Sequence, residues 1–159
     1  MKGKIIFLYI CIGITILLHF LWFTLPIVTY PLNKAQAYLC LARSSIDLNS
    51  IADNLEKAYL EIKDLHGNPC WWYPTKRTDL DYNKEILLEN IELARKVANT
   101  SSPSEYGYQR CVDNIQEMIL DLEDHIEEIK RWYLFSLPNV IFTLLYAVGL
   151  VIIVIAPID

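Results

Sequence analysis

Two long stretches without a charged residue constrain the fold of this chain more than any other feature of its sequence. The first runs from Ile5 to Thr29 and the second from Leu134 to Ile158, and neither contains Asp, Glu, Lys or Arg. A helix of about 20 apolar residues crosses the roughly 30 Å of hydrocarbon in a bilayer, and each stretch is longer than that. The sequence therefore predicts one transmembrane helix at each end of the chain, with the lipid bilayer as its partner.

The residues beside these stretches bear on the topology. Lys2 and Lys4 precede the first stretch and favour a cytoplasmic N-terminus. Lys130 and Arg131 lie on the domain side of the second stretch and oppose that orientation. We expect a multi-pass protein of the cell membrane, with both termini cytoplasmic and the middle domain extracytoplasmic. The alternative for the first stretch is a cleaved signal peptide, because the segment ending at Ala37 resembles a small-x-small cleavage site.

Three helical patterns lie between the two stretches. Apolar residues recur in each at alternating steps of three and four, which is typical of helices that pack in a coiled-coil manner. The first pattern covers Leu32 to Leu65, and the second ends near Asn99. The third begins with Ser102 as N-cap and Pro103 at the first helical position. The stripes are Ala37, Leu41, Ser44, Leu48, Ile51, Leu55, Ala58, Ile62 and Leu65 in the first, Leu80, Leu87, Ile91, Ala94 and Ala98 in the second, and Tyr108, Val112, Ile115, Ile119, Leu122, Ile126, Ile129 and Tyr133 in the third.

These patterns predict an all-α fold. It consists of a three-helix, coiled-coil-like extramembrane bundle over residues 31–133, flanked by transmembrane helices over residues 1–30 and 134–159. The first helix of the bundle would rise about 50 Å from the membrane at 1.5 Å per residue. Only a short turn separates the second and third helices, so they must meet at the far end of the bundle. The segment from His66 to Asp79 must then run back along the helices as an irregular aromatic strap.

The strap contains the densest group of large aromatic side chains in the chain. Trp71, Trp72 and Tyr73 follow Cys70 directly. Such residues dominate buried area wherever they pack, so one interpretation is that they cover the apolar side of the bundle. The other is an exposed surface that binds a partner, because aromatic clusters mark binding hot spots.

The heights of the cysteines on these predicted helices suggest one disulfide. Cys111 lies two turns into the third helix and Cys70 lies on the strap, so both would be near the far end of the bundle. Cys40 would lie close to the membrane and out of reach, because a disulfide needs Cα atoms within about 7 Å. We therefore expect a Cys70–Cys111 bridge in an oxidising compartment. Cys40 is left over, either as a small buried thiol or as the site of an interchain bond.

Several other residues are candidates for special roles. His19 lies in the first charge-free stretch, where an ionisable side chain is either an intramembrane polar site or a neutral structural group. Asn99 begins an Asn-Thr-Ser sequon and is a candidate glycosylation site. His66, Cys70 and Cys111 could supply three metal ligands, but the paired ligand spacing of a zinc site is missing.

The third helix carries a run of acidic residues. Its carboxylates indicate a solvated face, on which His125 is a surface residue, or a surface that attracts a basic partner or cations. This charge and the net charge of −5 argue against a nucleic-acid partner. The acidic residues are Asp113, Glu117, Asp121, Glu123, Asp124, Glu127 and Glu128.

The chain has no nucleophile-elbow, phosphate-loop or dinucleotide-binding glycine pattern. We predict that it is not an enzyme and uses no cofactor. The leading hypothesis is an accessory or scaffold subunit with a helical ectodomain, which binds other membrane proteins or associates with itself. One alternative is a small oligomeric channel or transporter component, and another is a helical-bundle sensor that acts through a partner. A redox or metal enzyme using Cys70, Cys111 and His66 is the remaining alternative.

Overall fold

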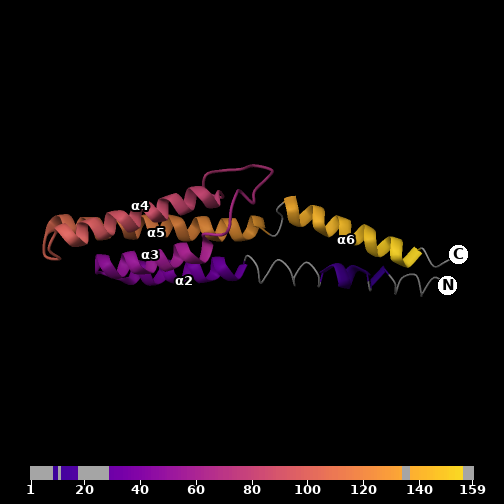
Figure 1. Ribbon diagram of the computed structural model, residues 1–159, viewed down its shortest axis with the longest axis horizontal. Coiled ribbons are helices and arrows are strands. Elements are labelled where there is room, and N and C mark those ends of the chain that lie inside the picture. The colour runs from indigo at the N-terminus through magenta and orange to yellow at the C-terminus, as the bar shows by residue number, and fades with distance from the viewer. Residues whose placement is uncertain (1–8, 11, 18–28, 134–136, 156–159) are drawn as a thin grey trace.

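The computed structural model describes residues 9–10, 12–17, 29–133 and 137–155. Regular structure within these ranges is helical. Four helices lie side by side and form an elongated bundle (Figure 1). They are α2 (Tyr30–Ser44), α3 (Leu48–Ile62), α4 (Leu80–Thr100) and α5 (Tyr106–Tyr133).

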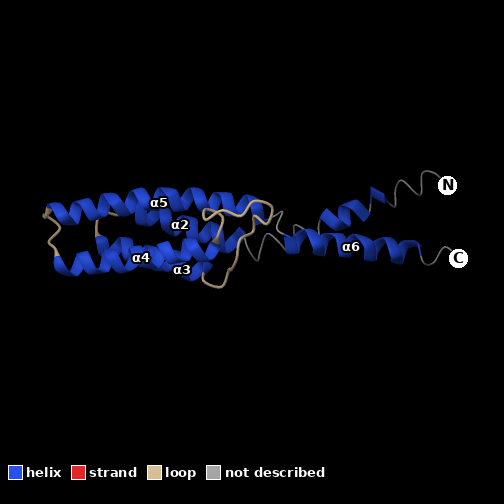
Figure 2. Ribbon diagram, turned by 90° about the horizontal axis from the view of Figure 1, so that it is seen from above, coloured by secondary structure: helices blue, strands red, loops and turns tan. Residues whose placement is uncertain are grey.

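The four helices form a closed ring. Each packs against the next one along the chain, and α5 completes the ring against α2. Successive connections lie at opposite ends, so that neighbouring helices are antiparallel (Figure 2). This is the arrangement of an up-down-up-down four-helix bundle. The predicted three-helix bundle is therefore wrong, because the segment from Leu32 to Leu65 forms a hairpin of two helices instead of one long helix.

The break between α2 and α3 has a local cause. Ser45 and Asp47 both have extended backbone, with φ/ψ of −85°/143° and −100°/125°. The carboxylate of Asp47 then accepts hydrogen bonds from the backbone N–H of Ser50 at 2.9 Å and from its hydroxyl at 3.0 Å. A side-chain oxygen in this position caps the free N–H groups at the start of a helix. Asp47 is thus the N-cap of α3, although the apolar stripe of the sequence continues through it.

Two side chains of α5 also stabilise the break by hydrogen bonds. The Tyr108 hydroxyl accepts a hydrogen bond from the backbone N–H of Leu48 at 2.8 Å and donates one to Asp47 at 3.1 Å. The Gln116 side-chain amide donates to the carbonyl oxygen of Ser45 at 2.9 Å. These bonds satisfy polar backbone groups that the turn would otherwise leave without partners in the interior.

The bundle core consists of one apolar stripe from each helix. The predicted stripes of α4 and α5 are confirmed, as is the part of the first stripe that lies on α3. On α2 the prediction is wrong, because Ala37 and Leu41 are exposed and a stripe of different phase faces the core. The buried residues of α2 are Leu32, Ala35, Leu39 and Ala42.

The connection between α3 and α4, residues 63–79, lies wholly at one end of the bundle, which we call the loop end (Figure 2). Because α3 has already run back to this end, the connection does not descend along the helices as predicted. Its start is fixed by Gly67, whose φ of +78° favours glycine. The carbonyl oxygen of Gly67 accepts a hydrogen bond from the N–H of Leu80 at 3.1 Å, which brings the two ends of the loop together.

The last helix, α6 (Leu137–Ile155), lies beyond the loop end and apart from the bundle (Figure 1). Within the described ranges, no helix is both long and apolar enough to cross a membrane. This contradicts the predicted pair of transmembrane helices and the multi-pass localisation in the cell membrane. Of the first predicted span, the structure describes residues 9–10, 12–17 and 29–30, which are helical, and the rest of that span lies outside the described residues.

Candidate functional site

The segment from His66 to Asp79, which we call the aromatic loop, is held together by its own hydrogen bonds. The Asn68 side chain spans it, donating to the carbonyl oxygen of Thr75 at 2.8 Å and accepting from the N–H of Cys70 at 3.0 Å. The Cys70 thiol is buried and donates to the carbonyl oxygen of Tyr73 at 3.1 Å. A compact loop with close ends and internal contacts is an Ω-loop in the usual sense.

The second half of the aromatic loop is fixed to α4. Thr75 and Thr78 exchange hydrogen bonds of 3.1 to 3.3 Å between their hydroxyl and backbone groups, and Thr78 is fully buried. Beneath them, the Asn83 amide donates to the carbonyl oxygens of Arg77 at 3.0 Å and Asp79 at 2.6 Å. Asn83 is buried, so these bonds satisfy both its own amide and the loop carbonyls.

One contact ties the same half of the loop to α5 directly, and a second does so through Asn83 of α4. His125 lies 2.7 Å from Asn83, between its Nδ1 and the amide Oδ1. Arg77 pairs with Glu128 at 3.4 Å. Burial, followed by the nearby Arg77 guanidinium, holds the pKa of His125 below the ordinary histidine value. The interpretation of His125 as a surface residue is therefore wrong, because its ring is half-buried at the junction of the loop, α4 and α5.

The first half of the loop is fixed through a buried lysine. The Lys84 ammonium donates to the carbonyl oxygens of Lys63 at 3.2 Å and Leu65 at 2.8 Å, which continue the chain after α3. It also pairs with Asp81 at 2.8 Å, and Asp81 accepts a hydrogen bond from the N–H of Gly67 at 3.0 Å. The hydrogen bond from Lys84 is the main cause that holds the pKa of Asp81 far below its usual range. The Lys84 ammonium thus donates hydrogen bonds to carbonyl groups that the end of α3 would otherwise leave without partners.

The tip of the aromatic loop points its largest side chains toward solvent. Trp72 is 77% exposed and Tyr73 is 75% exposed, whereas Trp71 is 45% exposed. The two indoles meet edge to face, with their centroids 5.6 Å apart and their planes at 81°. The rings of Trp72 and Tyr73 thus do not cover the bundle, which was the first of the two interpretations.

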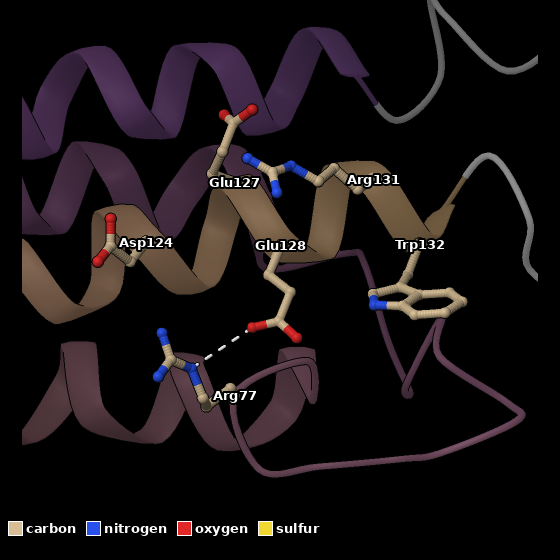
Figure 3. Close-up of a pocket in the computed structure, with 6 residues that line it drawn as sticks. All are labelled: Arg77, Asp124, Glu127, Glu128, Arg131 and Trp132. Carbon is tan, nitrogen blue, oxygen red and sulfur yellow. Dashed lines mark ion pairs between the residues drawn. The ribbon is translucent and has the colours of Figure 1, made fainter.

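A groove of about 590 Å³ lies beside the loop, along the C-terminal part of α5 (Figure 3). The Arg77–Glu128 ion pair crosses it, and the indole of Trp132 lies at one end (Figure 3). Its lining is mainly charged and carries both signs, so it suits a polar ligand or a charged segment of a partner. The lining residues are Arg77, Asp124, Glu127, Glu128, Arg131 and Trp132.

Comparisons of the chain with models of protein families, with curated proteins and with solved structures give no match. Similarity therefore assigns neither a family nor an activity to it.

The predicted disulfide between Cys70 and Cys111 is wrong. The three described cysteines, Cys40, Cys70 and Cys111, are free thiols. The loop that carries Cys70 contacts α5 at Glu128, and Glu128 lies about 25 Å along that helix from Cys111. The prediction failed because it placed the loop at the far end of one long first helix. Burial raises the pKa of the Cys111 thiol. Cys40 is exposed, and its role in an interchain bond stays a prediction.

The other candidate residues do not form a common site. His19 lies outside the described residues, and its role as an intramembrane polar site stays a prediction. Asn99 is exposed in the last turn of α4, and its glycosylation stays a prediction. In the part of the chain that the structure describes, no three His, Cys, Asp or Glu side chains are grouped as metal ligands would be. His66 belongs to the loop end, whereas Cys111 belongs to the other end of α5.

The residues that organise the loop were not identified from the sequence. Asn83 and Lys84 fall between Leu80 and Leu87, at positions of α4 that face the core. Polar residues at core-facing positions of a helical stripe are the signal that could have found them, because such groups need buried partners. His125 gave no comparable signal, since it stands in a run of acidic residues.

Proposed function

We propose that this protein is a non-enzymatic partner-binding module, an accessory or scaffold subunit, and that the aromatic loop is its contact surface. The observation that carries the proposal is the exposure of Trp72 and Tyr73 on a loop whose backbone is hydrogen-bonded within itself and to the bundle. Exposing two such rings to water is unfavourable for an isolated protein. Covering them with a partner would remove that apolar surface from solvent.

The loop also has the properties that favour tight binding. Tryptophan and tyrosine are the residues most enriched at binding hot spots. Binding is weakened when a flexible segment must become ordered, and a loop already fixed by Asn68, Asn83 and Lys84 avoids most of that cost. The fixed bundle beneath the loop therefore supports the proposal as much as the exposed rings do.

The adjacent groove supports a polar partner segment beside the aromatic contact. Asp124 and Arg131 lie on its α5 side, two helical turns apart. Charged groups at the edge of an interface contribute more to the choice of partner and to the rate of association than to affinity. We expect a protein partner that places an apolar residue on the loop and charged residues in the groove.

Site-specific photo-crosslinking tests the proposal. A photoreactive phenylalanine analogue replaces Trp72 in one variant and Tyr106 in a matched control, because Tyr106 is 79% exposed and lies at the start of α5, away from the loop. We expect a discrete protein adduct from position 72 and none from position 106. Adducts of equal yield at both positions, or no adduct at position 72, would contradict the proposal.

Alanine variants give an independent measurement. The double variant W72A/Y73A should lose the crosslinked partner from co-purification, while Y106A should retain it. Because these rings are exposed, both variants should unfold at nearly the same denaturant concentration as the unaltered protein.

The alternative of a helical-bundle sensor that acts through a partner would use the same surface. The crosslinking and alanine variants therefore test that alternative as well. The channel or transporter alternative required the two predicted transmembrane helices. The redox or metal alternative required His66, Cys70 and Cys111 to meet, and the loop end and the start of α5 keep Cys111 apart from the other two.

A further inference from the structure

The tautomer of His125 is fixed by its contact with Asn83. The Asn83 amide nitrogen donates to the carbonyl oxygens of Arg77 and Asp79, so its Oδ1 is the atom that faces His125 at 2.7 Å. An amide oxygen accepts hydrogen bonds and cannot donate them. His125 therefore carries its proton on Nδ1, and a second proton has to bind at Nε2.

Charged groups from two elements face this imidazole. Burial disfavours a second proton on the ring, as does the positive charge of Arg77 in the aromatic loop. The negative charges of Asp121, Asp124 and Glu128 on α5 favour that proton. Burial and Arg77 outweigh them, so the pKa of His125 lies below the ordinary histidine value. The contact from α4 is Asn83, which carries no charge. Glu128 thus faces both His125 and Arg77, and in this structure it pairs with Arg77.

We propose that His125, Glu128 and Arg77 form a proton-sensitive joint that holds the aromatic loop on the bundle. While His125 is neutral, the Glu128 carboxylate is available to Arg77 and the loop is tied to α5. When Nε2 takes up a proton from solvent, the ring becomes a cation that repels Arg77. It also attracts Glu128, which lies on the same helix face one turn away. The Arg77–Glu128 pair opens, and the loop loosens in mildly acidic solution.

The joint regulates the surface on which the proposed function rests. Trp72 and Tyr73 are presented by the loop that Arg77 ties down. A loosened loop has to be ordered again when a partner binds, so the affinity falls in acid. This consequence depends on the proposed function, whereas the joint itself can be measured on the protein alone.

Amide hydrogen exchange on the full-length chain tests the joint. The N–H groups of Thr75, Thr78 and Leu80 make loop hydrogen bonds, and their exchange reports how often the loop opens. Exchange is measured at about pH 7.5 and about pH 5, the lower value being chosen because the pKa of His125 lies below the ordinary histidine value, and is corrected for the intrinsic effect of pH. We expect protection to fall by up to about fivefold in acid, the ratio that corresponds to the roughly 1 kcal/mol of a partly exposed ion pair.

Three variants separate the joint from other effects of acid. H125Q removes the titrating ring but keeps an amide donor for Asn83, and R77M removes the repelled cation. H66Q is the matched control, because His66 is a histidine of the loop itself and pairs with Asp81 at 3.0 Å, away from Arg77 and Glu128. The acid-induced loss of protection should disappear in H125Q and R77M and persist in H66Q. A loss of the same size in H125Q, or no loss in the unaltered protein, overturns the proposal.

A titration of His125 by NMR keeps the proposal testable if H125Q does not fold. The Arg77 side chain is largely exposed, so R77M retains the bundle. Removing its charge should raise the pKa of His125, and E128Q should lower it. An unchanged pKa in R77M means that the two groups are not coupled and that the joint does not exist. None of these measurements needs the partner, so their failure leaves the partner-binding proposal intact, and the reverse also holds.

Discussion

At the scale of single residues, a few long-range hydrogen bonds decide the path of the chain. Tyr108 shows this most clearly, because its hydroxyl serves a backbone N–H that lies 60 residues earlier in the chain. The sequence predicted Tyr108 as a core residue from its place in the α5 stripe, and it is buried as expected. Its hydrogen bonds to Leu48 and Asp47 were not predicted, since periodicity says which face a residue occupies and nothing about the polar groups it meets there.

Replacing Tyr108 by phenylalanine measures how much its hydroxyl contributes to the free energy of unfolding. Tyr108→Phe keeps the ring but leaves the buried N–H of Leu48 without its acceptor. We expect the free energy of unfolding to fall by about 1–3 kcal/mol, the usual cost of an unsatisfied buried polar group. Denaturant unfolding followed by circular dichroism gives this value. Tyr106→Phe is the control and should leave the midpoint unchanged, because Tyr106 is 79% exposed.

At the scale of elements, the division of one predicted helix into α2 and α3 is the main difference between sequence and structure. The apolar spacing from Leu48 to Ile62 was predicted and lies in the core of α3. The same spacing was extended backward to Ala37, where it fails because α2 has its own stripe. A heptad pattern can cross a helix break without interruption when the residues of the break fall between two apolar positions, so periodicity alone does not locate the break.

The N-cap of α3 offers a test at this scale. Asp47→Ala removes the acceptor of the Ser50 hydrogen bonds and of the Tyr108 hydroxyl. We expect a loss of about 1 kcal/mol in the free energy of unfolding at neutral pH. Asp64→Ala, which removes an exposed carboxylate just after the other end of the same helix, should cause little loss.

The pH dependence of that loss has a definite sign. Hydrogen bonding from the Ser50 backbone is the main cause that lowers the pKa of Asp47 in the folded protein. The stabilisation from this carboxylate is therefore complete above its pKa in the unfolded chain, about 3.9, and is lost as the pH falls through the folded value. The difference between Asp47→Ala and the unaltered protein should shrink in acid. A difference that grows as the pH falls would contradict the capping role.

At the scale of the whole molecule, the four-helix ring brings distant parts of the chain to the loop end. The start of α2 and the end of α5 both lie there, beside the aromatic loop (Figures 1 and 2). This arrangement places the groove and the exposed rings of Trp72 and Tyr73 on the same end of the bundle. It also explains why Cys70 and Cys111 are far apart, since each belongs to a different end.

A zero-length crosslink tests the hairpin of α2 and α3 on which this topology depends. Lys34 of α2 and Glu61 of α3 are 3.3 Å apart in the hairpin, whereas one continuous helix would separate them by about 40 Å. A carbodiimide that joins amines to carboxylates should therefore link these two residues, as detected by mass spectrometry of the digested protein. Lys130 and Glu127 are 2.7 Å apart on α5 and serve as the internal control. Recovery of the control link without the Lys34–Glu61 link would contradict the α2–α3 hairpin and, with it, the four-helix bundle.

The sequence by itself determined that the middle of this chain is helical and which residues of α3, α4 and α5 face the core. Those properties depend on neighbours three and four positions away, which any local pattern records. The tertiary structure alone decided the break after Ser44, the position of the aromatic loop and the partners of Asn83, Lys84 and His125. Each of these depends on groups from other helices, such as Tyr108 and Gln116 at the break, and a hydrogen bond across 60 or 71 residues leaves no periodic trace in the sequence.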